Sequence, residues 1–130
     1  MSLSAADQHL LELARDVIAR RGKEDVHEIG AALRTRSGQT FAAVHLEAYV
    51  GRVAVCAEAI ALGMAAAAGD TDIETVVAVR RSGDVVSPCG MCRELVLDYA
   101  PSATVIVPEG DELVAIELAQ LLPRKYSRGA

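Results

Sequence analysis

Residues 87–93 have the sequence Ser-Pro-Cys-Gly-Met-Cys-Arg, and they follow a segment at 73–79 that is rich in β-branched residues. The β-branched segment predicts a buried strand, so the stretch after it marks the point where the chain passes from a sheet into a helix. Cys89 and Cys92 are three positions apart, with a proline before the first and a glycine between them. This spacing can turn two thiolates toward one point at the start of a helix, which provides half of a tetrahedral zinc site.

The other cysteine of the chain, Cys56, stands just before a ten-residue uncharged run at 59–68. That run predicts a helix over 54–68, which places Cys56 near a helix N-terminus. Three thiolates would leave the fourth zinc position open for water, and the carboxylate of Glu58, two residues after Cys56, could manage the protons of that water. The pattern therefore indicates a catalytic zinc site.

Length and composition favour one domain over residues 1–130. The chain has 130 residues, 52% of them hydrophobic, which is enough for one core but not for two. Its 18 acidic and 13 basic residues give a net charge of −5, so we expect neither polymeric nucleic acid nor an anionic membrane as a partner. No apolar run approaches the roughly 20 residues of a membrane span, no signal-peptide pattern begins the sequence, and the odd cysteine count favours reduced thiols. We therefore expect a cytoplasmic protein.

The periodicity of the apolar residues predicts an α/β fold. The expected helices cover 4–22, 54–68 and 89–99, with a short closing helix that ends at 122. The expected strands cover 29–35, 40–46, 73–79, 103–107 and 113–116, the first two joined by a turn at Ser37-Gly38. A hairpin followed by alternating helices and strands predicts a mixed sheet with helices on both faces.

A Cys-x-x-Cys pair is also compatible with a structural zinc site, a redox dithiol or two buried apolar cysteines. A structural site would need a fourth ligand, but His9, His27 and His45 are not at ligand spacing from any cysteine, so a closed site of three cysteines and one histidine stays an unsupported alternative. Redox chemistry explains neither Cys56 nor the acidic residue beside it. Catalytic zinc accounts for all three cysteines.

Glu58 alone would need no special role, because the helix dipole favours an acid in the first turn of a helix. Its context is more specific, since Cys56-Ala57-Glu58 followed by Pro88-Cys89-x-x-Cys92 matches the x-E…P-C-x-x-C signature of zinc deaminases. His45-Leu46-Glu47 has a similar spacing, but it ends a strand whereas Cys56 opens a helix. We therefore assign the metal to Cys56.

With these motifs in order over nearly its whole length, together with Ile-Gly-Ala-Ala-Leu at 29–33, the chain resembles the cytidine deaminase-like zinc nucleoside deaminases. Within that family it is most similar to the blasticidin S deaminase branch, through residues 62–69, 87–90 and 121–123. The resemblance implies a three-layer sandwich, in which a five-stranded mixed sheet lies between helices. It also implies a homotetramer in which neighbouring subunits complete each other's pockets.

The same resemblance implies roles for individual residues. Cys56, Cys89 and Cys92 would be the zinc ligands and Glu58 the proton shuttle, while Ala57 through its backbone N–H and Ser87 through its carbonyl would hold the base. The implied activity is the hydrolytic deamination of a small aminopyrimidine nucleoside, either cytidine, deoxycytidine or a modified relative such as blasticidin S, with release of ammonia. The alternatives are an inactive zinc-stabilised nucleoside-binding protein and a deaminase of a free base or purine.

Two departures from the family pattern concern charge and the sugar. Ala59 follows Glu58 where many three-cysteine cytidine deaminases carry an arginine, and Arg93 is the candidate to supply the missing charge unless it is an ordinary surface residue. His45 and Glu47 stand where those enzymes have an Asn-x-Glu pair that grips the ribose. We expect both side chains to contact substrate, with the alternative that His45 is a plain strand residue with an exposed ring.

Two further candidates lie on either side of this region. His27 occupies the position of an aromatic residue ahead of the 29–33 segment, and either it contacts substrate or its ring is simply exposed on a strand. Tyr126 is the best candidate to close over the base, unless the C-terminal segment is disordered.

Overall fold

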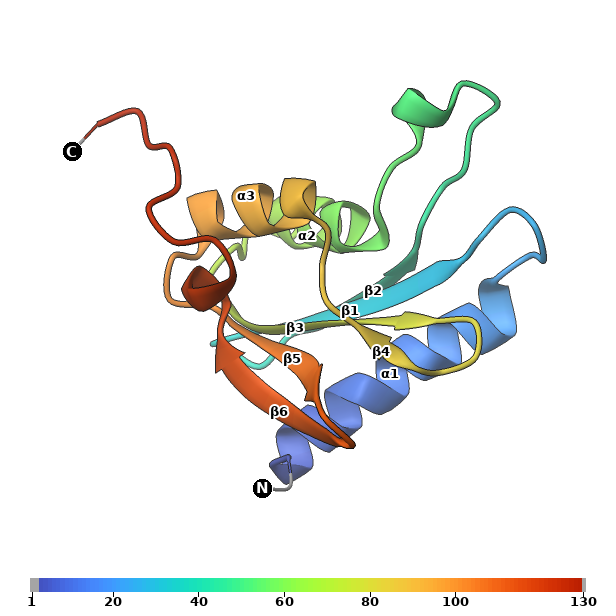
Figure 1. Ribbon diagram of the computed structural model, residues 1–130, viewed down its shortest axis with the longest axis horizontal. Coiled ribbons are helices and arrows are strands. Elements are labelled where there is room, and N and C mark those ends of the chain that lie inside the picture. Colours follow the sequence, from blue (N-terminus) through green and yellow to red (C-terminus); the bar gives the residue numbers. More distant parts are fainter. Residues whose placement is uncertain (1–2, 130) are drawn as a thin grey trace.

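The computed structural model describes residues 3–129 and has a six-stranded mixed sheet as its middle layer (Figure 1). The strands follow the order β2-β1-β3-β5-β6, and the short β4 pairs with β3. Only β3 and β5 run parallel, whereas the other neighbours are antiparallel. The strands are β1 (Ile29–Thr35), β2 (Thr40–Val44), β3 (Ile73–Arg80), β4 (Val85–Val86), β5 (Thr104–Glu109) and β6 (Glu112–Glu117).

Helices cover both faces of this sheet, as the sequence predicts. Helix α1 (Ala5–Arg21) lies on one face, while α2 (Ala57–Ala67) and α3 (Gly90–Tyr99) lie side by side on the other (Figure 1). The two sides have separate cores, because alternate residues of β3 point to opposite faces: Val77 packs with α1 and Val76 with α2 and α3. Strand β3 is therefore buried on both sides, which explains its nearly continuous apolar sequence.

The first helix and the hairpin form where their sequence signals stand. The Ser4 hydroxyl caps α1 by accepting a hydrogen bond of 3.1 Å from the backbone N–H of Asp7. Gly38 turns the β1–β2 hairpin with a φ of 96°, a conformation that glycine adopts without strain. Both elements confirm the sequence prediction.

Several boundaries differ from the prediction, most of them by one or two residues. Helix α2 begins at Ala57 rather than at 54, because a 3₁₀ helix, η1 (Gly51–Val53), and an isolated bridge between Leu46 and Val55 use the preceding residues. Strand β2 ends at Val44 rather than at 46 for the same reason. The closing helix is the 3₁₀ segment η2 (Leu118–Leu121).

The prediction of five strands was short by one. The missed strand, β4, has two residues, which is too few to show an alternating pattern. It brings the chain back along β3 and leads directly into Ser87 and the start of α3.

Within residues 3–129, no helix is both long and apolar enough to cross a membrane.

Candidate active site

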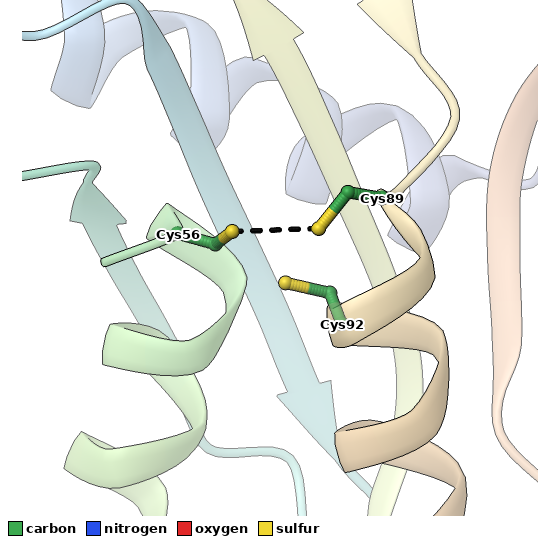
Figure 2. Close-up of side chains that lie close together, drawn as sticks. All are labelled: Cys56, Cys89 and Cys92. Atoms are coloured by element: carbon green, nitrogen blue, oxygen red, sulfur yellow. Dashed lines mark hydrogen bonds between the residues drawn. The ribbon is translucent and has the colours of Figure 1, made fainter. Parts of the chain in front are cut away.

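The three cysteines converge between the N-terminal ends of α2 and α3 (Figure 2). Cys56 is the N-cap of α2, Cys89 is the N-cap of α3, and Cys92 lies in the first turn of α3. Their sulfur atoms lie within 4.8 Å of one another, and the Cys56 and Cys89 sulfurs are 3.4 Å apart. Tetrahedral zinc with Zn–S bonds of about 2.3 Å would hold its sulfurs about 3.8 Å apart, so the cluster fits zinc without rearrangement of the backbone.

Burial opposes the ionisation of these thiols in different degrees. It raises the pKa of Cys92, with the charge of Glu58 adding to the effect, and it also raises the pKa of Cys56. For Cys89 desolvation acts in the same direction, but hydrogen bonds from the Cys92 backbone N–H and from the neighbouring thiols outweigh it and lower its pKa. A bound dication would reverse this balance for all three, so metal binding is expected to release protons.

Glu58 lies in the first turn of α2 and is only 5% exposed. Desolvation raises the pKa of its carboxyl group, and this effect exceeds that of the hydrogen bonds that favour the anion. A buried acid with a raised pKa, set in a cavity, has the properties of a group that accepts and returns protons during a reaction.

A cavity of about 210 Å³ opens beside the cysteines. It brings together six of the residues that the sequence singles out, namely His45, Cys56, Ala57, Glu58, Ser87 and Cys89. Its walls include Ile29, Val55 and Val86, so the polar groups face an apolar space. Such a space suits a flat ring that is held by a few oriented polar groups.

His45 lines this cavity, and Glu47 lies beside His45 without lining the cavity itself. The His45 side chain is 13% exposed, and its Nε2 atom is 3.9 Å from Glu47 Oε2. Glu47 lines a separate depression with Val26 and Tyr49. The mouth therefore combines an imidazole with a half-exposed carboxylate, and the alternative of a fully exposed His45 ring is wrong.

His27 does not line the cavity. Its Nδ1 atom lies 2.7 Å from the carbonyl oxygen of His45, so it contacts the backbone of the rim residue rather than the space where a substrate would lie. The structure thus gives no direct substrate contact to His27.

Arg93 forms hydrogen bonds with carbonyl oxygens on two sides. Its Nε atom donates to Pro88 at 2.9 Å and its Nη1 atom to Leu121 at 3.0 Å. These bonds tie the loop that carries Cys89 to η2, and the side chain is not an ordinary surface arginine.

Tyr126 lies on the outer side of α3, away from the cavity. It is 76% exposed and lines a separate depression with Leu95 and Asp98. The neighbouring Lys125 holds the segment there, because its Nζ atom is 2.6 Å from Asp98 and 3.3 Å from Glu94. The structure therefore does not bring Tyr126 to the pocket of its own chain, contrary to our expectation.

The apolar wall residues were not predicted from the sequence. Val55 and the rim come together through reciprocal backbone hydrogen bonds of 2.9 Å between Leu46 and Val55, which join two segments separated by a long loop. The only signal was that apolar residues continue after the end of β2, and that pattern does not specify a partner.

Comparisons with known proteins agree with this site. Residues 4–108 match the sequence model of the cytidine and deoxycytidylate deaminase zinc-binding region. The blasticidin-S deaminase of Bacillus cereus is 47% identical over 98% of this chain and 96% of its own length. The cytidine deaminase of Halalkalibacterium halodurans is 28% identical over 77% of each chain.

Solved structures share the fold. The cytidine deaminase from Mycobacterium leprae superposes with a TM-score of 0.80 and 26% identity, covering 93% of this chain and 100% of that one. The enzyme from Mycobacterium tuberculosis gives a TM-score of 0.81 with 21% identity, covering 95% of this chain and 99% of that one. The α/β sandwich expected from the sequence is thus confirmed.

Proposed function

This chain belongs to the cytidine and deoxycytidylate deaminase family, and we propose that Cys56, Cys89 and Cys92 hold its zinc while Glu58 carries the protons of the reaction. It is a zinc-dependent hydrolase that deaminates cytosine nucleosides. The observation that carries the residue assignment is the meeting of three thiols and a buried carboxyl group at one cavity.

The residues around the cavity can be assigned to the successive steps of the deamination. Zinc, when bound, supplies a Lewis acid that makes water a usable nucleophile near neutral pH. Glu58 accepts one proton from the attacking water and passes it to the ring nitrogen as the water oxygen bonds to the amine-bearing carbon. It then takes the second proton from that new hydroxyl and gives it to the amine, so that the C–N bond breaks, ammonia departs and the carbonyl group forms. Its raised pKa allows it to hold the proton between these transfers. The Ala57 N–H donates to the carbonyl oxygen of the base, and the Ser87 carbonyl accepts from the exocyclic amine.

The charge of the site needs compensation. Three thiolates and a dication carry a net charge of −1, which would weaken the acidity of the zinc. The positive N-terminal ends of α2 and α3 both face the cysteines and supply part of the compensation. Arg93 adds a positive charge nearby, although its guanidinium contacts carbonyl oxygens.

The substrate is a nucleoside rather than a free base, since His45 and Glu47 offer polar groups beyond the space for the ring. Ammonia release from cytidine, deoxycytidine, cytosine, blasticidin S and an aminopurine nucleoside tests this proposal. We expect turnover of at least one cytosine nucleoside and little turnover of cytosine or the purine. Equal rates with free cytosine would contradict the nucleoside assignment. Zinc-loaded protein that releases no ammonia from any of them would support the inactive binding protein instead.

The proposal extends to assembly and location: residues 1–130 act as one domain of a cytoplasmic homotetramer. Leu46, Tyr49, Val50 and Val53 are exposed on the segment around η1, which projects away from the sheet (Figure 1). Apolar side chains on a projecting segment favour contact with another copy. Sedimentation velocity at micromolar concentration tests the assembly, and a single 13.7 kDa species would contradict it.

A further inference from the structure

We propose that residues 27–29 and His45 hold each other in a hydrogen-bonded clasp, and that this clasp fixes His45 as a permanent Nε2–H donor at the mouth of the cavity. The inference rests on the proposed function, because it specifies what the mouth recognises on a nucleoside. His27 acts in it as a positioning residue, since its ring contacts His45 and does not line the cavity.

The first half of the clasp fixes the proton of His27. Its Nδ1 atom is 2.7 Å from the backbone carbonyl oxygen of His45. A carbonyl oxygen can only accept a hydrogen bond, so the proton must be on Nδ1 of His27. This bond holds the backbone at residue 45, just past the end of β2.

The second half fixes the proton of His45 in the opposite sense. The backbone N–H of Glu28 donates to His45 Nδ1 at 2.7 Å, and that of Ile29 approaches the same atom at 3.3 Å. A backbone N–H can only donate, so Nδ1 of His45 carries a lone pair and the ring proton is on Nε2. The segment at 27–29 thus uses one side chain and two backbone groups to fix the position and the tautomer of His45.

The consequence is a defined pattern at the mouth. His45 Nε2–H is a donor, and Glu47 Oε2, 3.9 Å from it, is an acceptor. A sugar hydroxyl satisfies both, because its oxygen accepts from His45 while its proton is donated to Glu47. An amide at this position could turn to donate or to accept, whereas the fixed imidazole can only donate. The mouth therefore selects a substrate that places an oxygen lone pair against His45.

Histidine NMR tests the clasp directly, because the chain has only three histidines. Long-range ¹⁵N–¹H correlation on the zinc-loaded protein, with a His9→Gln variant to assign the remaining signals, reports which ring nitrogen carries the proton. We expect His45 to be protonated on Nε2 and His27 on Nδ1. A proton on Nδ1 of His45 would overturn the proposal. A protein that releases no ammonia from any cytosine nucleoside would contradict the proposed function. The NMR measurement of the two histidine tautomers would still show, independently of activity, whether the clasp exists.

Kinetics test the positioning role of His27. His27→Phe keeps a ring but removes the donor, and we expect it to raise the KM for the nucleoside by about 2- to 10-fold with little change in kcat. His27→Asn places an amide donor near the position of Nδ1 and should restore most of the KM. His9→Phe, on the exposed side of α1, is the matched control and should change neither constant. An unchanged KM in His27→Phe, or an Asn variant as impaired as the Phe variant, would overturn the role.

Substrate analogues test the selected group. Cytidine, 2′-deoxycytidine and 3′-deoxycytidine differ by single sugar hydroxyls, so the recognised oxygen should appear as a KM penalty in one of the deoxy compounds. We expect that penalty to shrink in His45→Phe, because the donor that contacts the oxygen is gone. Equal penalties in the wild-type protein and His45→Phe would overturn the recognition of a sugar oxygen by His45.

Discussion

The two ends of the cavity are supported in different ways. The zinc end stands on the first turns of α2 and α3, where Ala57 is fully buried and Cys92 is 1% exposed, so the core holds its geometry. The mouth stands on residues that have already left β2, and its segment continues to the exposed Tyr49 and Val53. The difference teaches that the chemistry is tied to the packing of the fold, while recognition depends on a segment that can change without disturbing that packing.

Substitutions at the two ends should therefore differ in kind. Loss of a group at the zinc end removes metal or a proton transfer, and the reaction then stops or slows by orders of magnitude. Loss of a group at the mouth removes one hydrogen bond to substrate, which changes affinity by a limited factor.

The largest expected effect is that of Cys89→Ala. With one of three thiolates missing, the zinc content should fall from one per chain to near zero, and ammonia release should be lost. Elemental analysis and the ammonia assay measure both quantities. The matched control is Met91→Ala, because Met91 lies between the two cysteines but is 65% exposed, and it should keep its zinc. Full zinc content in Cys89→Ala would transfer the ligand role to another residue.

Glu58→Gln should retain zinc but slow kcat by about 10²- to 10⁴-fold, since an amide cannot shuttle protons. Single-turnover ammonia release in the zinc-loaded variant is the measurement. Glu12→Gln, an exposed acid on α1, serves as the control and should leave the rate unchanged. Turnover at the wild-type rate in Glu58→Gln would show that another group moves the protons.

The contrast between the two ends also explains what the sequence could predict. The cysteines and Glu58 belong to short local motifs, and their positions at helix starts follow from capping and periodicity alone. The helix boundary at Ala57 was still misplaced by three residues, because η1 and the Leu46–Val55 bridge take up the residues before the helix and no periodic pattern marks either of them.

At the mouth, the residue types were evident but their geometry was not. The sequence pointed to His27 and His45 as possible substrate contacts, yet only the structure shows that His27 contacts the other residue's backbone. The position of Tyr126 away from the pocket of its own chain could not be predicted for a related reason. The pairing of Lys125 with Glu94 and Asp98 on α3 is a tertiary contact that no local pattern indicates.

Glu47→Ala tests whether the loss of one group at the mouth lowers activity by only a limited factor. We expect kcat/KM for the true nucleoside substrate to fall by about 10- to 150-fold, which corresponds to the loss of one charged hydrogen bond worth about 1.5–3 kcal/mol, with zinc content unchanged. The control is Glu24→Ala, an exposed acid in the loop after α1. If Glu47→Ala were as active as that control, Glu47 would have no part in recognition.

Arg93 tests whether the zinc end depends on charge or on position. Because its two hydrogen bonds hold the Cys89 loop against η2, we expect Arg93→Met to release zinc to a chelator about tenfold faster than the wild-type protein. Arg93→Lys keeps the charge but cannot form the same pair of bonds, so it should lose zinc nearly as fast. A lysine variant with wild-type zinc release would favour charge compensation over positioning.

The smallest expected effect concerns the stability of the metal-free chain. We expect the buried carboxyl group at the zinc end to lower this stability, and the exposed carboxyl group at the mouth to leave it unchanged. Burial raises the pKa of Glu58 above its unfolded value, so the folded metal-free chain binds this proton more tightly than the unfolded chain does. Stability must then fall as pH rises from the unfolded pKa of about 4.3 to the folded one, because folding at higher pH buries a charge.

Glu58→Gln removes that charge while keeping nearly the same shape. In chelator-treated, reduced protein we expect the variant to have a higher Tm than the wild-type protein by a few degrees at about pH 8, with a smaller difference at about pH 5. Glu47→Gln is the control, because the Glu47 side chain is 48% exposed and the substitution removes no buried group. A metal-free Glu58→Gln that melts below the wild-type protein at the higher pH would mean that the buried carboxylate stabilises the fold, and the contrast between the two ends would then be confined to catalysis.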